Sequence, residues 1–186
     1  MDAETTKALA AFGFLTVLEC PEHGLFGGYL VLSPHGRPLE FRCSTPVVAS
    51  RAQEILYGPT LRPYLFADVV GQSLVAGAEL PVEVILTDQR DMLPLALVRP
   101  EEVLLVEAGA DPGRHSNCGT CATINGCRVI AAPTSTIDAD RIARLLEPMA
   151  AHVILIEPFE RIRAALLEAQ ASTQDALELG DDRAAA

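Results

Sequence analysis

Two apolar segments joined by a short link place the strongest constraint on how the N-terminal part of this chain can fold. Residues 28–32 and 38–43 read as strands, and the link 33–37 contains Pro34 and Gly36. Proline fixes φ and glycine accepts a positive φ, so this link favours a tight reversal. Residues 12–19 alternate loosely and end at a proline, which cannot donate to a ladder, so they predict a further strand. The N-terminal part is therefore predicted to be a small antiparallel meander.

Helical periodicity replaces this pattern after Pro46. One predicted helix ends at Gly58, and a second runs from Thr60, which can cap it, towards Gly77. Further along the chain, the apolar runs 82–87, 95–98, 103–106, 128–132 and 152–156 read as strands, and residues 138–150 and the stretch after Pro158 read as helices.

The predicted fold class is therefore mixed α/β (α+β). It consists of the N-terminal antiparallel meander with two helices, followed by a βαβα-like unit with parallel pairing that carries a cysteine loop. We expect one compact domain over residues 1–171, and leave open a subdivision near residues 78–81 or 108–113. Residues 172–186 are acidic and rich in alanine, which predicts a mobile tail.

Charge and composition argue against several classes of partner. The formal net charge is -11, from 25 acidic and 14 basic residues, which would repel a phosphate backbone and an anionic membrane surface. Aromatic residues make up only 5% and there is no Trp, so the stacking platforms of single-strand binders are scarce. The first residues lack the pattern of an export signal. We expect a cytoplasmic protein with no nucleic-acid and no membrane partner.

Three cysteines in a short loop carry the clearest chemical signal. Cys118, Cys121 and Cys127 form a C-x2-C-x5-C array, and His115 lies three residues ahead of it. Five cysteines in a chain without an export signal indicate free thiols in a reducing compartment. A Cys-x-x-Cys knuckle lets two thiolates converge on one ion, and Cys127 would add a third sulfur. The array therefore predicts a zinc ion or an iron–sulfur cluster, with a redox dithiol as the alternative.

The fourth ligand of this centre is open. Cys43 is the first choice, because it ends a predicted hairpin strand and would clip the meander to the C-terminal unit. His115 and Cys20 are the alternatives, and Cys20 forms a Cys-Pro-Glu-His pair with His23.

Two resemblances bear on the cysteines. The C-x2-C-x5-C array resembles the three-cysteine part of auxiliary iron–sulfur clusters in the SPASM extensions of radical-SAM enzymes, which implies a ligand geometry. Cys20-Pro21-Glu22 together with the Cys118 to Cys121 knuckle is similar to the two halves of a zinc deaminase site, which implies Glu22 as proton shuttle.

The sequence thus indicates a metal-stabilised accessory or protein-binding protein with no visible catalytic apparatus. An iron–sulfur redox subunit or enzyme is the main alternative, and a deaminase-like hydrolase is a distant one. Residues 57–66, rich in tyrosine and proline, are typical of protein contacts, although a packed corner between two helices explains them more simply. Asp88, Arg90 and Asp91 follow a predicted strand, where α/β proteins often place functional groups, but a solvated charged loop is the favoured interpretation.

Overall fold

One mixed sheet organises the molecule. The computed structural model describes residues 10–21, 23–109 and 120–184, with side chains up to residue 172. Its strands stand in the order β3-β2-β1-β4-β5-β7-β6. Their bounds are β1 Phe12–Cys20, β2 Gly24–Leu32, β3 Pro38–Cys43, β4 Val84–Thr87, β5 Glu102–Ala108, β6 Cys121–Ile124 and β7 Cys127–Ala131. Strands from both sides of residues 78–81 therefore lie in a single sheet.

The pairing confirms the predicted mixed α+β class and the N-terminal meander. β1, β2 and β3 pair antiparallel in chain order, and β1, β4 and β5 run parallel to one another. β7 is antiparallel to both β5 and β6. The parallel pairing was expected after the cysteine loop and lies instead before it.

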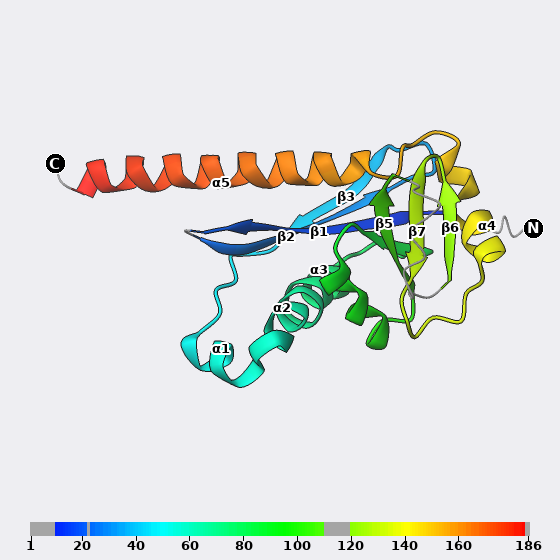
Figure 1. Ribbon diagram of the computed structural model, residues 1–186. Helices are drawn as coiled ribbons and strands as arrows, with labels where there is room; N and C mark the ends of the chain where they lie inside the picture. The colour runs from blue at the N-terminus through cyan, green and yellow to red at the C-terminus, as the bar shows by residue number, and fades with distance from the viewer. Residues whose placement is uncertain (1–9, 22, 110–119, 185–186) are drawn as a thin grey trace, which may run out of the picture.

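Helical segments cover both faces of the sheet (Figure 1). They are α1 Arg51–Tyr57, the 3-10 turn η1 Gly58–Thr60, α2 Leu61–Pro63, the π-helix η2 Tyr64–Gly71, α3 Gln72–Ala76, the 3-10 helix η3 Arg90–Leu97, α4 Ala139–Ala150 and α5 Glu157–Ala184. α5 runs along one face and α1 to α3 lie on the other (Figure 1). α5 continues through the expected tail as far as Ala184. In the described ranges no helix combines the length and apolarity needed to cross a bilayer.

The sequence of β1 explains why both faces are covered. Phe12 and Phe14 belong to the core beneath α5, whereas Leu15 and Val17 belong to the core beneath η2 and α3. All four are almost fully buried. Because side chains point alternately to the two faces of a sheet, a strand whose odd and even positions are both apolar must be covered on both faces.

Two strands expected from the sequence are absent from the described residues. Residues 152–156 form the turn between α4 and α5: Val153 and Leu155 are buried and Ile154 points outward, so the alternation is real but no strand pairs with it. Residues 95–98 fall in and just after η3, where three buried side chains (Met92, Leu93 and Leu95) pack against the sheet from a helical backbone. In both places a short apolar run fills the core without joining a ladder.

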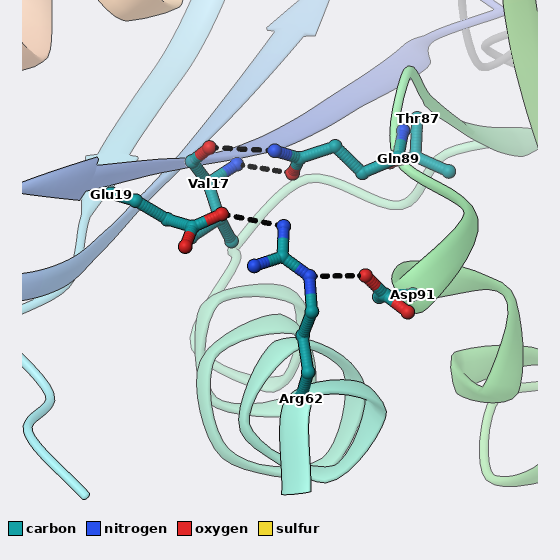
Figure 2. Close-up of polar contacts among 6 residues, drawn as sticks. All are labelled: Val17, Glu19, Arg62, Thr87, Gln89 and Asp91. Atoms are coloured by element: carbon teal, nitrogen blue, oxygen red, sulfur yellow. Dashed lines mark hydrogen bonds and ion pairs between the residues drawn. The ribbon is translucent and has the colours of Figure 1, made fainter. Parts of the chain in front are cut away.

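A glutamine side chain extends the sheet where β4 stops. β4 pairs with β1 only over Phe12 to Leu15, although β1 continues to Cys20. The Gln89 amide takes the next ladder position (Figure 2): Oε1 accepts from the Val17 N–H at 2.7 Å, and Nε2 donates to the Val17 carbonyl at 2.7 Å. The Thr87 hydroxyl accepts from the Gln89 N–H at 3.2 Å and helps to hold the turn. The side chain thus acts as a short third neighbour of the β1 backbone, after β2 and β4.

Loss of this amide should destabilise the fold. In Gln89→Leu the buried Val17 N–H and carbonyl both lose their partner, so we expect the free energy of unfolding to fall by about 2–4 kcal/mol in urea titrations. Gln72→Leu, at an exposed position in α3, is the matched control and should change it by less than about 0.5 kcal/mol. An equal loss in both variants would contradict the role of Gln89.

Candidate functional site

The carboxyl edge of the parallel strands is where polar groups gather. From β1 the chain builds outward through β2 and β3 on one side, and through β4 and β5 on the other. Such a reversal of strand order leaves ligand-accessible space at the carboxyl ends of the strands. Asp88 and Gln89 follow β4 at this point, and Glu107 lies near the end of β5.

Arg62 bridges two carboxylates on one side of this edge. Its Nη2 lies 2.5 Å from Glu19 Oε1 at the end of β1, and its Nε donates to Asp91 Oδ2 at 2.5 Å (Figure 2). The guanidinium also lies 4.5 Å from the centre of the Phe66 ring. Hydrogen bonding to Glu19 raises the pKa of Arg62, against the opposing effect of burial, and Asp91 adds to the rise. About half of the Arg62 side chain stays exposed, so it can reach a ligand.

Asp88 is held on the other face of the sheet. The Thr16 hydroxyl on β1 donates to Asp88 Oδ1 at 2.8 Å, and Arg163 from α5 pairs with Oδ2. The Asp88 side chain is only 10% exposed. The Asp88 carboxylate thus connects β1 with α5, close to the contact between Gln89 and Val17.

Glu107 completes the edge. Arg90 pairs with its Oε1, and Arg128 Nε lies 3.5 Å from its Oε2. Each carboxylate of this edge, that is Glu19, Asp88, Asp91 and Glu107, is therefore bonded to an arginine. No three His, Cys, Asp or Glu side chains in the described parts of the chain could share an ion. Four arginine-bound carboxylates on two faces do not fit a divalent metal, which needs several oxygen ligands to converge.

Two tyrosines flank Arg62 along the sequence of the same helical segment. Tyr57 and Tyr64 stack with their ring centres 4.4 Å apart and their planes at 27°. A side-chain hydrogen bond with Tyr64 raises the pKa of Tyr57. A groove of about 450 Å³ lies next to them, and Arg62, Glu19 and Phe66 are among the residues that line it. The segment 57–66 is thus the helix corner that the sequence suggested, and it carries both the arginine of the carboxyl edge and a stacked ring pair.

The described cysteines of the predicted metal loop do not converge. Asn125 and Gly126 have φ of 49° and 75°, as in a type I′ turn, so Cys121 and Cys127 lie on the two strands of a hairpin. In its register Cys127 faces Ile124 and Cys121 faces Ile130, which puts the two thiols on opposite faces of the sheet. Cys127 is buried and Cys121 is exposed. Two sulfurs on one zinc ion would have to lie within about 4 Å of each other.

The other ligand candidates are also spread apart. Cys43 ends β3, at the edge of the sheet opposite to β6, and five strand spacings of about 4.8 Å separate β3 from β7. Cys20 Sγ lies 3.4 Å from His23 Nδ1, so that predicted pair does form. It lies at the carboxyl end of β1, three strand positions away from β7 in the sheet. Cys118 and His115, like Glu22 of the deaminase resemblance, lie outside the described residues.

The sequence missed most of the contacts at the carboxyl edge. It marked Asp88, Arg90 and Asp91 as a charged loop, but it did not connect them with Glu19, Arg62 or Arg163. The contacts join residues 29 to 75 positions apart, and no local spacing signals them. The one usable signal was Arg62 within the tyrosine-rich segment.

Comparison with known proteins gives a likeness of fold. No protein family and no curated protein matches the sequence. Among solved structures, the catalytic domain of human Endonuclease V matches with a TM-score of 0.53 and 14% identity, over 93% of this chain and 86% of that one. Endonuclease V from Ciona intestinalis, in complex with a 24mer DNA containing an inosine, matches with a TM-score of 0.41 and 11% identity over 75% and 77%. A further structure of human Endonuclease V has a TM-score of 0.39 and 14% identity over 86% and 87%.

These findings correct the functional expectation. The interpretation as a metal-stabilised accessory protein with a protein partner and no catalytic apparatus is wrong, because the chain shares the fold of an Endonuclease V catalytic domain. The description as a zinc or iron–sulfur cysteine cluster is wrong as well, since the described residues hold no such group. The exclusion of nucleic acid is also wrong: net charge averages over the whole surface and does not describe one edge of a sheet.

The thiols should differ sharply in reactivity. Burial raises the pKa of Cys127, against a backbone hydrogen bond at Ile156 that lowers it, so less reactive thiolate forms at a given pH. We expect iodoacetamide at pH 8 to alkylate the exposed Cys43 and Cys121 at least about 100-fold faster than Cys127, as measured by peptide mass spectrometry. Joint protection of Cys121 and Cys127 that a chelator removes would contradict the hairpin arrangement.

Proposed function

We propose that this chain is a nucleic-acid-processing protein that binds its strand at the carboxyl edge of β1 and β4, beside Arg62. The observation that carries the proposal is the likeness to an Endonuclease V catalytic domain, which spans nearly the whole chain. The chemistry of the edge supports it, because a half-exposed guanidinium lies there, and a stacked tyrosine pair belongs to the same helical segment.

Each of these groups matches a part of a nucleotide. A guanidinium offers planar paired donors that suit phosphate oxygens, and it stacks on flat rings. Tyrosine rings accept an unpaired base without reading its sequence. Arg62 already uses both properties, since it bonds carboxylates in its plane and lies over Phe66. A phosphate oxygen can replace the Glu19 carboxylate without a change in the hydrogen-bond geometry.

The charge of the edge predicts a modest dependence on salt. Glu19, Asp88, Asp91 and Glu107 are matched by four arginines (Arg62, Arg90, Arg128 and Arg163), so the edge is neutral in a chain whose net charge is -11. A neutral surface contacts few phosphates through net charge, and we expect about two to be neutralised on binding. The slope of log K against log salt should then be about -1.4 on a single strand.

The binding surface can be tested with one arginine. Arg62→Gln should weaken the binding of a fluorescein-labelled 20-nucleotide single strand by about tenfold, as measured by anisotropy. The magnitude of the salt slope should fall by about 0.7, the value of one lost phosphate contact. Arg141→Gln, exposed on α4, is the matched control and should bind as the parent does. Failure of the parent to bind DNA or RNA at 50 mM salt would overturn the proposal, and so would equal losses in both variants.

Strand cleavage is a second candidate, favoured by the position of Asp88. This carboxylate is almost buried where β4 ends beside β1, at the same edge as Arg62 but on the opposite face of the sheet. If it assists hydrolysis as a base, Asp88→Asn should slow cleavage by about 100-fold or more while affinity changes less than about threefold. The measurement is gel analysis of the labelled strand incubated with Mg²⁺ and, in parallel, with EDTA. Cleavage that survives in Asp88→Asn would remove this residue from the reaction.

A further inference from the structure

The outer edge of β3 is an apolar strand edge without a neighbour. β3 is the last strand of the sheet on its side, and among the described strands it pairs with β2 alone. Leu39 and Phe41 are 42% and 41% exposed, and Cys43 is exposed as well. The unpaired backbone groups of an edge strand are a template for a further strand, and natural sheets often block it with a lysine. β3 contains no lysine.

The backbone of Phe41 faces the outside of the sheet. The Ser44 N–H donates to the Gly27 carbonyl at 2.9 Å, so residue 44 turns its backbone towards β2. Successive residues of an antiparallel ladder turn their N–H and carbonyl to alternate sides, so Phe41 and Cys43 turn away from β2. The Phe41 side chain shares the face of its partner Leu30, which is the face that α5 covers. Phe41 thus offers both hydrogen-bonding groups and an exposed ring to a new strand.

The charged side chains of β3 lie on the other face and are held in place. The Glu40 carboxylate accepts from the N–H of Glu79 at 3.1 Å and of Leu80 at 3.0 Å. Arg42 Nη1 lies 3.6 Å from Glu40 Oε1, and the Arg42 side chain is 40% exposed. A carboxylate has about four acceptor positions, so Glu40 can still accept from a second arginine.

The order of these charges fits a second copy of the same strand. When two copies of β3 run antiparallel with Phe41 opposite Phe41 of the second copy, Glu40 stands opposite Arg42 of the second copy, and symmetry repeats the pair. Opposite charges across an antiparallel pair stabilise it, and like charges destabilise it. A two-fold axis at Glu40 or at Arg42 would set like charges opposite each other. The edge is therefore complementary to itself when the axis passes through Phe41.

We propose that β3 is a dimerisation edge, at which a second copy of this chain adds its own β3 antiparallel with the two-fold axis at Phe41. The two sheets then join into one continuous sheet. Phe41 exchanges N–H to carbonyl hydrogen bonds with Phe41 of the second copy, and the two rings meet on the face that α5 covers. The interface is separate from the proposed nucleic-acid surface, since β3 stands two strand positions from β1 and Arg62 lies on the other face.

The dimer should be weak, because one strand pair is a small contact. Interfaces well below about 1,600 Å² form transient complexes. We expect a dissociation constant on the order of 10 μM for the full chain under reducing conditions, measured by sedimentation velocity between about 1 and 200 μM. A chain that is still monomeric at the highest of these concentrations would overturn the proposal.

Phe41→Lys tests the edge with a charge that blocks strand pairing. We expect the dimer to weaken by at least about 20-fold, and the exposure of Phe41 means that the variant should keep the melting temperature of the parent. Leu97→Lys is the matched control: Leu97 is 69% exposed at the end of η3, ahead of β5, which stands four strand positions from β3. It should dimerise as the parent does. A dimer that survives in Phe41→Lys, or an equal loss in Leu97→Lys, would overturn the proposal.

A thiol on the two-fold axis tests the register without relying on Phe41→Lys. In Phe41→Cys the two new thiols stand opposite each other with their Cα atoms about 5.5 Å apart, which suits a disulfide. The Cys43 residues of the two copies are about 14 Å apart in the same register. We expect copper phenanthroline to link Phe41→Cys at least about tenfold faster than the control Leu97→Cys, with the linked peptide identified by mass spectrometry. Linkage through Cys43 in place of position 41, or equal rates in the two variants, would overturn the proposal.

Discussion

The contact between Gln89 and the Val17 backbone is the interaction on which the functional edge depends. β4 is too short to pair with β1 beyond Leu15, so without the amide the last part of β1 would carry an unpaired N–H and carbonyl on that side. The same glutamine lies between Asp88, which pairs towards α5, and the η3 turn, which carries Asp91. One side chain that imitates a peptide group therefore fixes where both sets of ion pairs can form.

The charges at this edge are balanced locally, which the net charge of the chain does not show. Four carboxylates at the ends of neighbouring strands would repel one another if they stood alone. Their arginines arrive from four different elements, which are α2, η3, β7 and α5, and Glu19 and Asp91 share the arginine from α2. The edge is thus assembled by tertiary folding, and its charge balance bears no relation to the composition of the whole chain. A partner inferred from the net charge of the whole chain, -11, therefore takes no account of the charge at this edge.

The sequence predicted local geometry well and long-range geometry poorly. The β2 to β3 hairpin was found because Pro34 and Gly36 determine their own turn, and α4 was found because its apolar residues recur on one helical face, where Ile142, Leu146 and Met149 are buried. The cysteine array failed for an instructive reason. Cys127 was expected to add a third sulfur to the Cys-x-x-Cys pair, whereas Asn125-Gly126 closes a hairpin in which an odd offset sends Cys121 and Cys127 to opposite faces. Spacing along the chain could not distinguish a knuckle from a hairpin until the register was known.

Gly13 and Tyr29 break two local rules at one point. Glycine inside a strand costs about 0.5–1 kcal/mol relative to alanine, and an unpaired buried hydroxyl costs about 1–3 kcal/mol. Each could be relieved by a common residue, alanine with a smaller partner or phenylalanine at position 29. Neither feature strengthens the sheet, because the phenol crosses β1 without bonding to any described group. Departures that weaken a fold in this way are characteristic of functional sites. The strand that the Gln89 amide completes at one end thus carries, against its other end, a buried hydroxyl with no partner among the described residues.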